Sequence, residues 1–250
     1  MLPWSTSPNL VRRPALSSTA MSCRSVLTLV LIGLLIVPSV ALAVSENDSY
    51  WTFNFNLGLS DHLNEDEKVT ITHGDDSYEF RSDYESKSLT TPEYYALRFG
   101  RWKDGRAWEF ELIHDKVYLE KNLPDEIDEF HLSDGYNHIL INHAWALDSF
   151  IVRLGAGTVV SHPDITIEGE QYRERGSGYI PRFWQDGYVW NGYSLHAAVE
   201  HRHYFGADDR WFLTSEAKYT YARHRSDIED VSVRIDAQTI HLNVGLGMRI

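Results

Sequence analysis

The residues of this chain with the widest chemical reach are its twelve histidines, because imidazole transfers protons near neutral pH and also binds metal ions. His138, His196 and His241 occupy polar positions that alternate with apolar ones in three separate segments. Together with Glu200 they form a donor set suited to zinc or iron. No ligand spacing of the H-E-x-x-H kind accompanies them. We therefore favour internal hydrogen bonding as their role and keep a metal site as the alternative.

A second group of reactive side chains lies where three alternating segments begin or end. His114 ends one segment, Asp134 and Asn137 open the next, and His162 ends the one after that. If these segments are consecutive strands, the four residues converge at one edge, where they can grip or modify a phosphorylated, acylated glycolipid. Ser-Asp-Gly and His-Pro are also ordinary turn sequences, and the residues alone favour that simpler interpretation.

The elements that must position these residues are β-strands. In W-T-F-N-F-N-L-G-L-S (51–60) every odd position is large and apolar and no even position is, and residues 239–250 repeat the pattern. A period of two is typical of strands and not of helices. Six less regular segments bring the total to eight strands of about 9–13 residues, near the length of a tilted transmembrane strand: 94–102, 108–118, 136–147, 150–160, 193–204 and 211–223.

The connections between these segments alternate in length. Three are short, at 103–106, 148–149 and 206–209, and Asp104-Gly105 is a tight-turn signal. The others are long and polar, roughly 61–92, 119–135, 161–188 and 224–236. Outer-membrane barrels have short periplasmic turns and long outer loops. The sequence therefore predicts an all-β, up-and-down, eight-stranded antiparallel transmembrane barrel with the long segments at the cell surface.

A soluble lipocalin-like barrel has the same period but keeps its apolar residues inside. Here the polar face of the segments carries full charges of both signs, and aromatic residues gather near segment ends, as at membrane interfaces. Because eight strands leave room only for side chains, we predict an interior plug of paired charges, with Arg98 next to Glu109 or Glu111. The charged inward positions are Arg98, Glu109, Glu111, Arg153, Glu200, Arg202, Glu216, Lys218 and Arg249.

The first 43 residues differ from the rest. Arg12, Arg13 and Arg24 are followed by an apolar run over 26–40 and by Ala-Leu-Ala at 41–43, which predicts a cleaved signal peptide whether translation starts at the first methionine or at Met21. Residues 44–250 then form one barrel domain in the bacterial outer membrane. The net charge of −13 argues against a nucleic-acid partner, and the single cysteine, Cys23, lies in the segment expected to be removed.

Three segments carry a resemblance to a known family: W-E-F-E-L-I-H-D-K-V-Y (108–118), F-H-L-S-D-G-Y-N-H-I-L-I-N (130–142) and L-G-A-G-T-V-V-S-H-P (154–163). They resemble eight-stranded outer-membrane barrels of the OmpA/OmpX-like type, and more closely a group that includes the lipid A oxidase of rhizobia. The resemblance implies a barrel that contacts outer-membrane lipid and lipopolysaccharide and an activity on the lipid A glucosamine with oxygen. Insertion would need the barrel-assembly machinery.

Three functions compete at this point: a structural or surface-binding barrel, a lipid A-modifying enzyme, and a small-solute pore. The predicted charged plug disfavours the pore. A deacylase triad of Ser194, His196 and Glu200 is weak, because these residues share the inward face that a lipid ester does not easily reach. We favour the structural or surface-binding barrel and keep the enzyme as the alternative.

Overall fold

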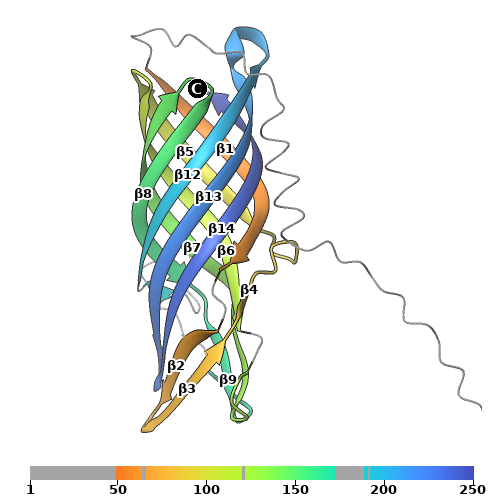
Figure 1. Cartoon of the computed structure of the whole chain (residues 1–250), viewed down its shortest axis with the longest axis vertical. Helices are drawn as coiled ribbons and strands as arrows, with labels where there is room; N and C mark the ends of the chain where they lie inside the picture. The colour runs from red at the N-terminus through yellow and green to blue at the C-terminus, as the bar shows by residue number, and fades with distance from the viewer. Residues whose placement is uncertain (1–48, 64–65, 120–121, 173–188, 191) are drawn as a thin grey trace, which may run out of the picture.

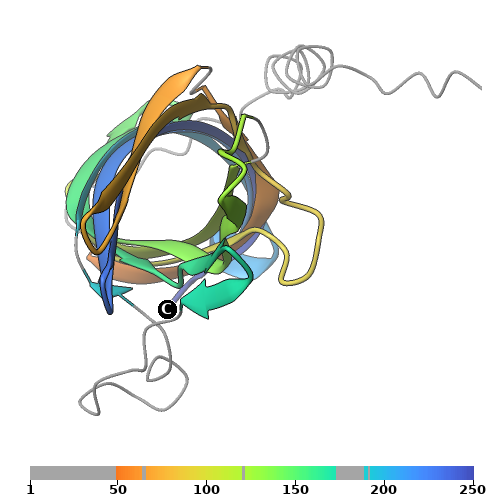
Figure 2. The ribbon, with the colours of Figure 1, turned by 90° about the horizontal axis from the view of Figure 1, so that it is seen from below.

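Antiparallel strands make up the described part of the computed structural model, which is residues 49–63, 66–119, 122–172, 189–190 and 192–250. The predicted signal segment 1–43 lies outside these residues. Long strands wind around a common axis and close into a ring (Figures 1 and 2). In the part of the chain so described, no helix is long and apolar enough to cross a membrane.

The ring contains eight strands, and each pairs antiparallel with the next. The first and last pair with each other from Thr52–Arg249 to His62–Thr239, which closes the barrel and confirms the predicted fold class. In ring order the strands are β1 (Tyr50–His62), β5 (Tyr95–Lys103), β6 (Arg106–Leu119), β7 (Ile127–Leu147), β8 (Phe150–Ser161), β12 (Gly192–Phe205), β13 (Trp211–Ile228) and β14 (Val231–Arg249).

Short turns join the strands at one end of the barrel, as the sequence predicts. Asp104 and Gly105 both have positive φ, 52° and 71°, which is the backbone that a two-residue hairpin turn requires. Strands β7 and β8 are joined in the same compact way, and β12 reaches β13 through the short 3-10 helix η2 (Ala207–Asp209). The end of the chain lies at this same end of the barrel (Figure 1).

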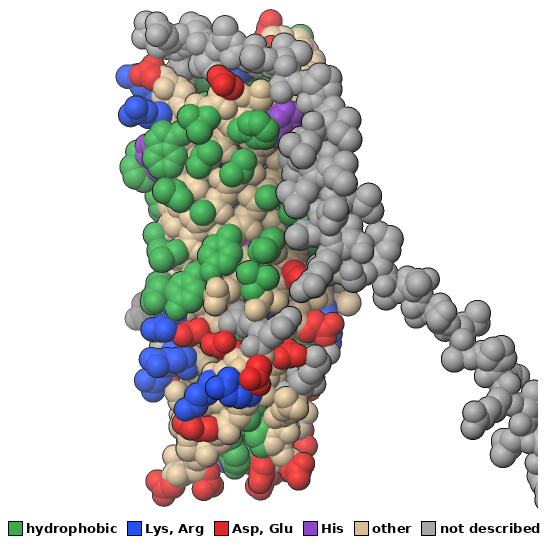
Figure 3. Space-filling model, in the orientation of Figure 1, with side chains coloured by type: hydrophobic (Ala, Val, Ile, Leu, Met, Phe, Trp, Pro, Cys, Tyr) green, Lys and Arg blue, Asp and Glu red, His purple; other side chains and the backbone are tan. Residues whose placement is uncertain are grey.

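Side chains alternate between the two faces of the wall as predicted. In β1 the inward Thr52, Asn54 and Asn56 are buried, whereas the outward Trp51 and Phe53 are 41% and 40% exposed. Large apolar side chains are exposed on all eight ring strands, and they form a belt on the face of the outer wall that Figure 3 shows. The usual relation between burial and polarity is therefore inverted in this part of the molecule.

Opposite the short turns the barrel continues beyond this belt as an extension, where the four segments expected to be loops carry strands instead. That expectation is wrong. Segment 224–236 is almost wholly strand, because β13 runs to Ile228 and β14 begins at Val231. The other segments contain β2 (Glu67–His73), β3 (Asp76–Ser82), β4 (Tyr84–Glu85), the first part of β7, β9 (Asp164–Ile167) and β10 (Glu170–Tyr172). The short strand β11 (Val189–Trp190) follows directly after the segment 161–188.

The interior of the extension is apolar. Residues from β2, β6, β7, β9, β13 and β14 form one buried cluster, the extension core, which includes Ile71, Phe130, Ile165 and Ile235. Tyr84 lies in the same cluster, and burial raises its pKa well above the ordinary value for tyrosine. Here apolar residues point inward and charged side chains lie on the outer surface (Figure 3), so the extension has the polarity of a water-soluble protein.

Candidate functional site

The middle of the barrel holds a network of buried charges contributed by five of its strands. Arg98 of β5 is its centre: the guanidinium donates hydrogen bonds to Glu200 at 2.6 Å, Glu111 at 2.8 Å and Glu216 at 2.5 Å. Glu111 is the residue directly opposite Arg98 on β6, so the predicted hairpin pair is present. The other two carboxylates come from β12 and β13, across the interior from β5.

A second arginine, Arg153, bonds to two of the same carboxylates and to Glu109. Arg153 of β8 donates to Glu109 at 2.5 Å, Glu200 at 3.1 Å and Glu216 at 3.2 Å. Four acidic and four basic side chains, all at most 7% exposed, thus neutralise one another, which is the condition for burying charge without a large penalty. We call this set the charge network; its members are Arg98, Glu109, Glu111, Arg153, Glu200, Arg202, Glu216 and Lys218.

The ninth inward charge that the sequence suggested behaves differently. Arg249 lies at the end of β14, where its guanidinium packs over the rings of Tyr50 and Tyr204, 4.6 Å from each ring centroid. It makes no salt bridge to the charge network among the described residues.

Amide side chains complete the hydrogen bonding around the charge network. Asn142 donates to Glu111 at 2.7 Å and Asn243 donates to Glu216 at 3.1 Å. The amides fit because glycines lie beside them: a Cβ on Gly155 would overlap the Asn142 side chain. The sequence pattern identified Asn142 as inward, but its pairing with a particular carboxylate depends on side-chain geometry that periodicity does not contain.

Between the charge network and the extension core lies a layer of buried histidines that includes all three predicted metal candidates. The ring centroids of His138 and His241 are 6.3 Å apart, and His196 Nδ1 lies 3.6 Å from a Glu111 carboxylate oxygen. Two of the three bond to hydroxyls: His138 Nδ1 to Ser194 Oγ at 2.8 Å and His241 Nε2 to Thr220 Oγ1 at 2.9 Å.

Several buried polar atoms of this histidine layer have no hydrogen-bond partner among the described residues. Both ring nitrogens of His196, together with His138 Nε2 and His241 Nδ1, are buried without a hydrogen-bond partner among the described residues. Even so, no group of three or more His, Cys, Asp or Glu side chains in the described ranges is arranged to hold a metal ion. The metal site predicted at His138, His196 and His241 stays a prediction.

The rim group predicted at the ends of three segments is partly brought together. Strands β6, β7 and β8 are adjacent, and His114 lies directly opposite Asn137 with a 2.8 Å hydrogen bond between Nδ1 and Oδ1. The His162 backbone N–H donates to the carbonyl of Gly135 at 3.0 Å, so His162 also lies beside the start of this part of β7. The Asp134 side chain lies outside the described residues.

The rim pair faces away from the barrel interior. His114 stacks on Tyr95 of β5 with the ring centroids 5.0 Å apart, and both follow the outward alternation of their strands. His114 and Asn137 are each 5% exposed. An imidazole held by an amide can transfer protons, but the imidazole of His114 is almost completely buried. The catalytic role of His114, Asp134, Asn137 and His162 therefore stays a prediction.

Comparisons with known proteins give only distant similarities. No protein-family model and no curated protein matches the chain. Among solved structures, the outer membrane protein AlkL in lipid bilayers shares 15% identity, with 86% of this chain and 96% of that chain covered and a TM-score of 0.44. The attachment invasion locus protein Ail of Yersinia pestis shares 10% identity, with 82% of this chain and 100% of that chain covered and a TM-score of 0.35. The outer membrane protein OprG of Pseudomonas aeruginosa shares 11% identity, with 82% of this chain and 98% of that chain covered and a TM-score of 0.36. The closed ring itself confirms the predicted eight-stranded antiparallel barrel.

Proposed function

We propose that this chain is an integral outer-membrane barrel with a sealed interior, which serves a structural or surface-binding role and exposes its extension at the cell surface. One observation carries the proposal: along the same strands, the polar face points in and the apolar face points out. On β13, Thr214, Glu216 and Lys218 are buried inside, whereas Leu213 and Tyr219 are exposed outside. Such a wall suits a surrounding of lipid, where every backbone polar group pairs between strands.

The height of the belt fits a membrane. On β13 it extends from Trp211 to Tyr219, eight residue steps. At about 3.4 Å per residue and a strand tilt of about 40° this is roughly 20 Å of depth. Outer-membrane barrels have an apolar band about 25 Å tall.

The charge network supports the sealed interior. An eight-stranded barrel is just wide enough for its own side chains, and here those side chains bridge strands on opposite sides of the ring, as Arg98 does between Glu111 on β6 and Glu200 on β12. A solute would have to break several buried ion pairs to pass. Removing one partner of such a pair costs about 3–5 kcal/mol, so thermal opening is rare.

Conductance measurements test this proposal. We expect the purified chain, inserted in planar lipid bilayers, to give no steady current, and vesicles that contain it to take up small sugars no faster than empty vesicles. The unboiled protein should migrate as a folded band that boiling abolishes, which shows that the barrel was present. A steady conductance from folded, inserted protein would contradict the sealed interior.

A lipid A-modifying activity is the second candidate, favoured by the His114–Asn137 hydrogen bond at the outward rim. We expect the lipid A mass profile of cells to change with expression of the protein only if this candidate is correct. His114→Ala should then abolish the change while the barrel remains folded. An unchanged lipid A profile in expressing cells would contradict the enzymatic candidate and leave the structural or surface-binding role as the only one of the two.

A further inference from the structure

One open sheet edge of the extension belongs to β3. Strand β2 pairs with β14 on one side and with β3 on the other, whereas β3 pairs with β2 alone among the described residues. The two strands form a hairpin at the end of the extension that lies farthest from the short turns (Figure 1). An unpaired edge exposes a row of backbone N–H and C=O groups with which another chain can pair.

The register of the hairpin shows which residues of β3 present these groups. The two-residue turn at 74–75 makes His73 and Asp76 a hydrogen-bonded pair. Such pairs alternate along an antiparallel ladder with pairs whose N–H and C=O groups point away from each other. Three residues therefore direct their backbone groups toward the open side: Ser77, Glu79 and Arg81.

The inward side chains of β3 also lack a covering strand. Val69 and Ile71 of the paired strand β2 are completely buried. Tyr78 and Phe80 of β3 pack against the extension core but stay partly exposed. The open edge, which we call the β3 edge, therefore offers apolar surface and backbone hydrogen-bonding groups together. When a peptide adds to a sheet, main-chain pairing gives affinity and side-chain contacts give specificity.

The surroundings of the β3 edge are acidic. The pKa of the Tyr78 phenol is raised by partial burial and then by three nearby carboxylates: those of Asp76, Glu168 and Glu126. The Glu168 backbone N–H donates to the Glu126 carbonyl at 2.8 Å, so the turn after β9 and the start of β7 meet there. None of the three carboxylates makes a salt bridge among the described residues. Unpaired negative charge favours a cationic partner.

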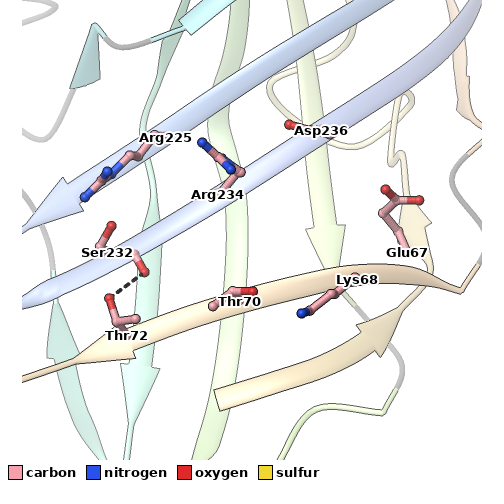
Figure 4. Close-up of a pocket in the computed structure, with 8 residues that line it drawn as sticks. All are labelled: Glu67, Lys68, Thr70, Thr72, Arg225, Ser232, Arg234 and Asp236. Atoms are coloured by element: carbon pink, nitrogen blue, oxygen red, sulfur yellow. Dashed lines mark hydrogen bonds between the residues drawn. The ribbon is translucent and has the colours of Figure 1, made fainter. Parts of the chain in front are cut away.

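The outer face of the same sheet carries charges of both signs. Figure 4 shows a cavity of about 360 Å³ there, between β2, β13 and β14. Its charged lining residues are Glu67, Lys68, Arg225, Arg234 and Asp236. Lys68 also pairs with Glu79 at 2.9 Å, and Arg225 pairs with Asp227 at 2.8 Å. Because the two signs offset each other, this face does not favour a partner of either charge, unlike the β3 edge.

We propose that the β3 edge binds an extended, cationic segment of a partner protein, which joins the sheet as a further strand. Alternate apolar side chains of the segment cover Tyr78 and Phe80, and its lysines or arginines lie near Glu126 and Glu168. A second copy of this chain fits less well, because two acidic ends would then meet. This inference rests on the surface-binding role proposed above and deepens it, since the partner reaches the extension from outside the cell.

The experiment uses the folded full chain in micelles of an uncharged detergent. Fluorescence anisotropy measures binding of a labelled ten-residue peptide in which lysine alternates with valine and tyrosine. We expect saturable binding, and at least tenfold weaker binding when glutamate replaces the lysines. The same peptide with methylated backbone nitrogens lacks the donors for strand pairing and should also bind at least tenfold more weakly. Equal binding of the lysine peptide and either altered peptide would overturn the proposal.

Variants of the chain locate the binding site. Ser77→Pro removes one backbone N–H from the β3 edge but keeps the pairing with β2, because proline is tolerated where the N–H faces away from the ladder. We expect it to weaken binding of the lysine peptide about tenfold, whereas the matched control Ser77→Ala should bind as wild type does. Glu126→Gln combined with Glu168→Gln should also weaken binding, and Glu93→Gln, at an exposed position before β5, should not.

Limited proteolysis shows that each variant keeps its extension folded. Equal binding by Ser77→Pro and Ser77→Ala would overturn strand pairing at the β3 edge. A dimer of the wild-type chain that Ser77→Pro abolishes, without peptide binding, would replace the cationic partner with a second copy and overturn the proposal. Peptide binding by a chain whose extension faces the periplasm would contradict the proposed surface placement but support binding at the edge.

Discussion

The barrel within the belt and the extension beyond it are built from the same strands with opposite polarity. On β14 the inward residues are polar at Thr239, His241 and Asn243 but apolar at Val233 and Ile235. The outward residues change in the opposite sense, from Val244 and Leu246 in the belt to Ser232, Arg234 and Asp236 in the extension. Strand geometry does not change at the crossover near Ala222 and Ala237, which are paired across β13 and β14.

This comparison teaches that backbone pairing sets the shape of the molecule and the surroundings set which face is polar. In lipid the hydrophobic effect no longer drives apolar groups inward, so the interior is held by ion pairs and hydrogen bonds. Beyond the belt water returns, and burial of apolar area stabilises the extension. The two regions should therefore fail in different ways when their interiors are changed.

The largest expected effect is loss of a partner in the charge network. Arg153→Leu removes the nearest cation of Glu109 and one of the cations that hold Glu200 and Glu216, which should cost about 3–5 kcal/mol. Urea unfolding in lipid vesicles, followed by the heat-modified gel band, measures it. Lys103→Leu, at the exposed end of β5, is the control. Equal stability of the two variants would mean that the interior is wet and the charges are screened.

A substitution in the extension core should act more locally. Ile235→Ala removes a fully buried side chain and should cost about 2–5 kcal/mol. Because the charge network and the belt are untouched, we expect faster proteolysis of the extension while the heat-modified band persists. Loss of that band would show that the two regions fold as one cooperative unit.

The outer wall offers a depth-matched pair on one strand. Val244 and Gln238 are both exposed outward residues of β14, one in the belt and one near its border. Val244→Arg should cost about 2–4 kcal/mol and Gln238→Arg about 0–1 kcal/mol, as for arginine at the midplane and at the interface. Urea unfolding in vesicles measures both free energies of unfolding. Similar costs at the two positions would show that the membrane boundary does not lie between them.

Topology can be tested with almost no effect on stability. A peptide tag inserted beside Asp76, at the exposed hairpin between β2 and β3, should be accessible to antibody on intact cells. A tag at Asp104-Gly105 should be accessible only after the outer membrane is broken. The reverse pattern of accessibility would contradict the proposed orientation of the barrel, with the extension at the cell surface.

Much of this fold could be predicted from the sequence, because alternation with apolar residues is strong wherever lipid faces the strand. The sequence pattern missed the extension for a physical reason. V-S-V-R-I-D-A (231–237) alternates as well as the belt does, but its charged outward residues resemble a loop. The extension has the same period of two as the belt, but there the apolar residues face the interior and the polar residues face outward.

The site was less accessible to prediction. Neighbouring contacts such as Arg98–Glu111 and His114–Asn137 follow from strand order and register. Contacts across the barrel, such as Arg98–Glu200, depend on side-chain reach between strands that are far apart in the ring. The cavity that Arg225 and Arg234 line between β2, β13 and β14 could not be predicted, because these parts of the strands were expected to be loops.

The inversion of polarity along single strands is tested most directly by a nitroxide scan along β14. Single cysteines are placed at each position from 231 to 249 in a background lacking Cys23, the only cysteine of the sequence. In lipid vesicles, outward labels from Ile240 to Met248 should collide mainly with oxygen from the lipid phase, and those from Ser232 to Asp236 mainly with a water-soluble nickel reagent. Inward labels should meet neither. Outward labels with the same accessibility along the whole strand would contradict the account.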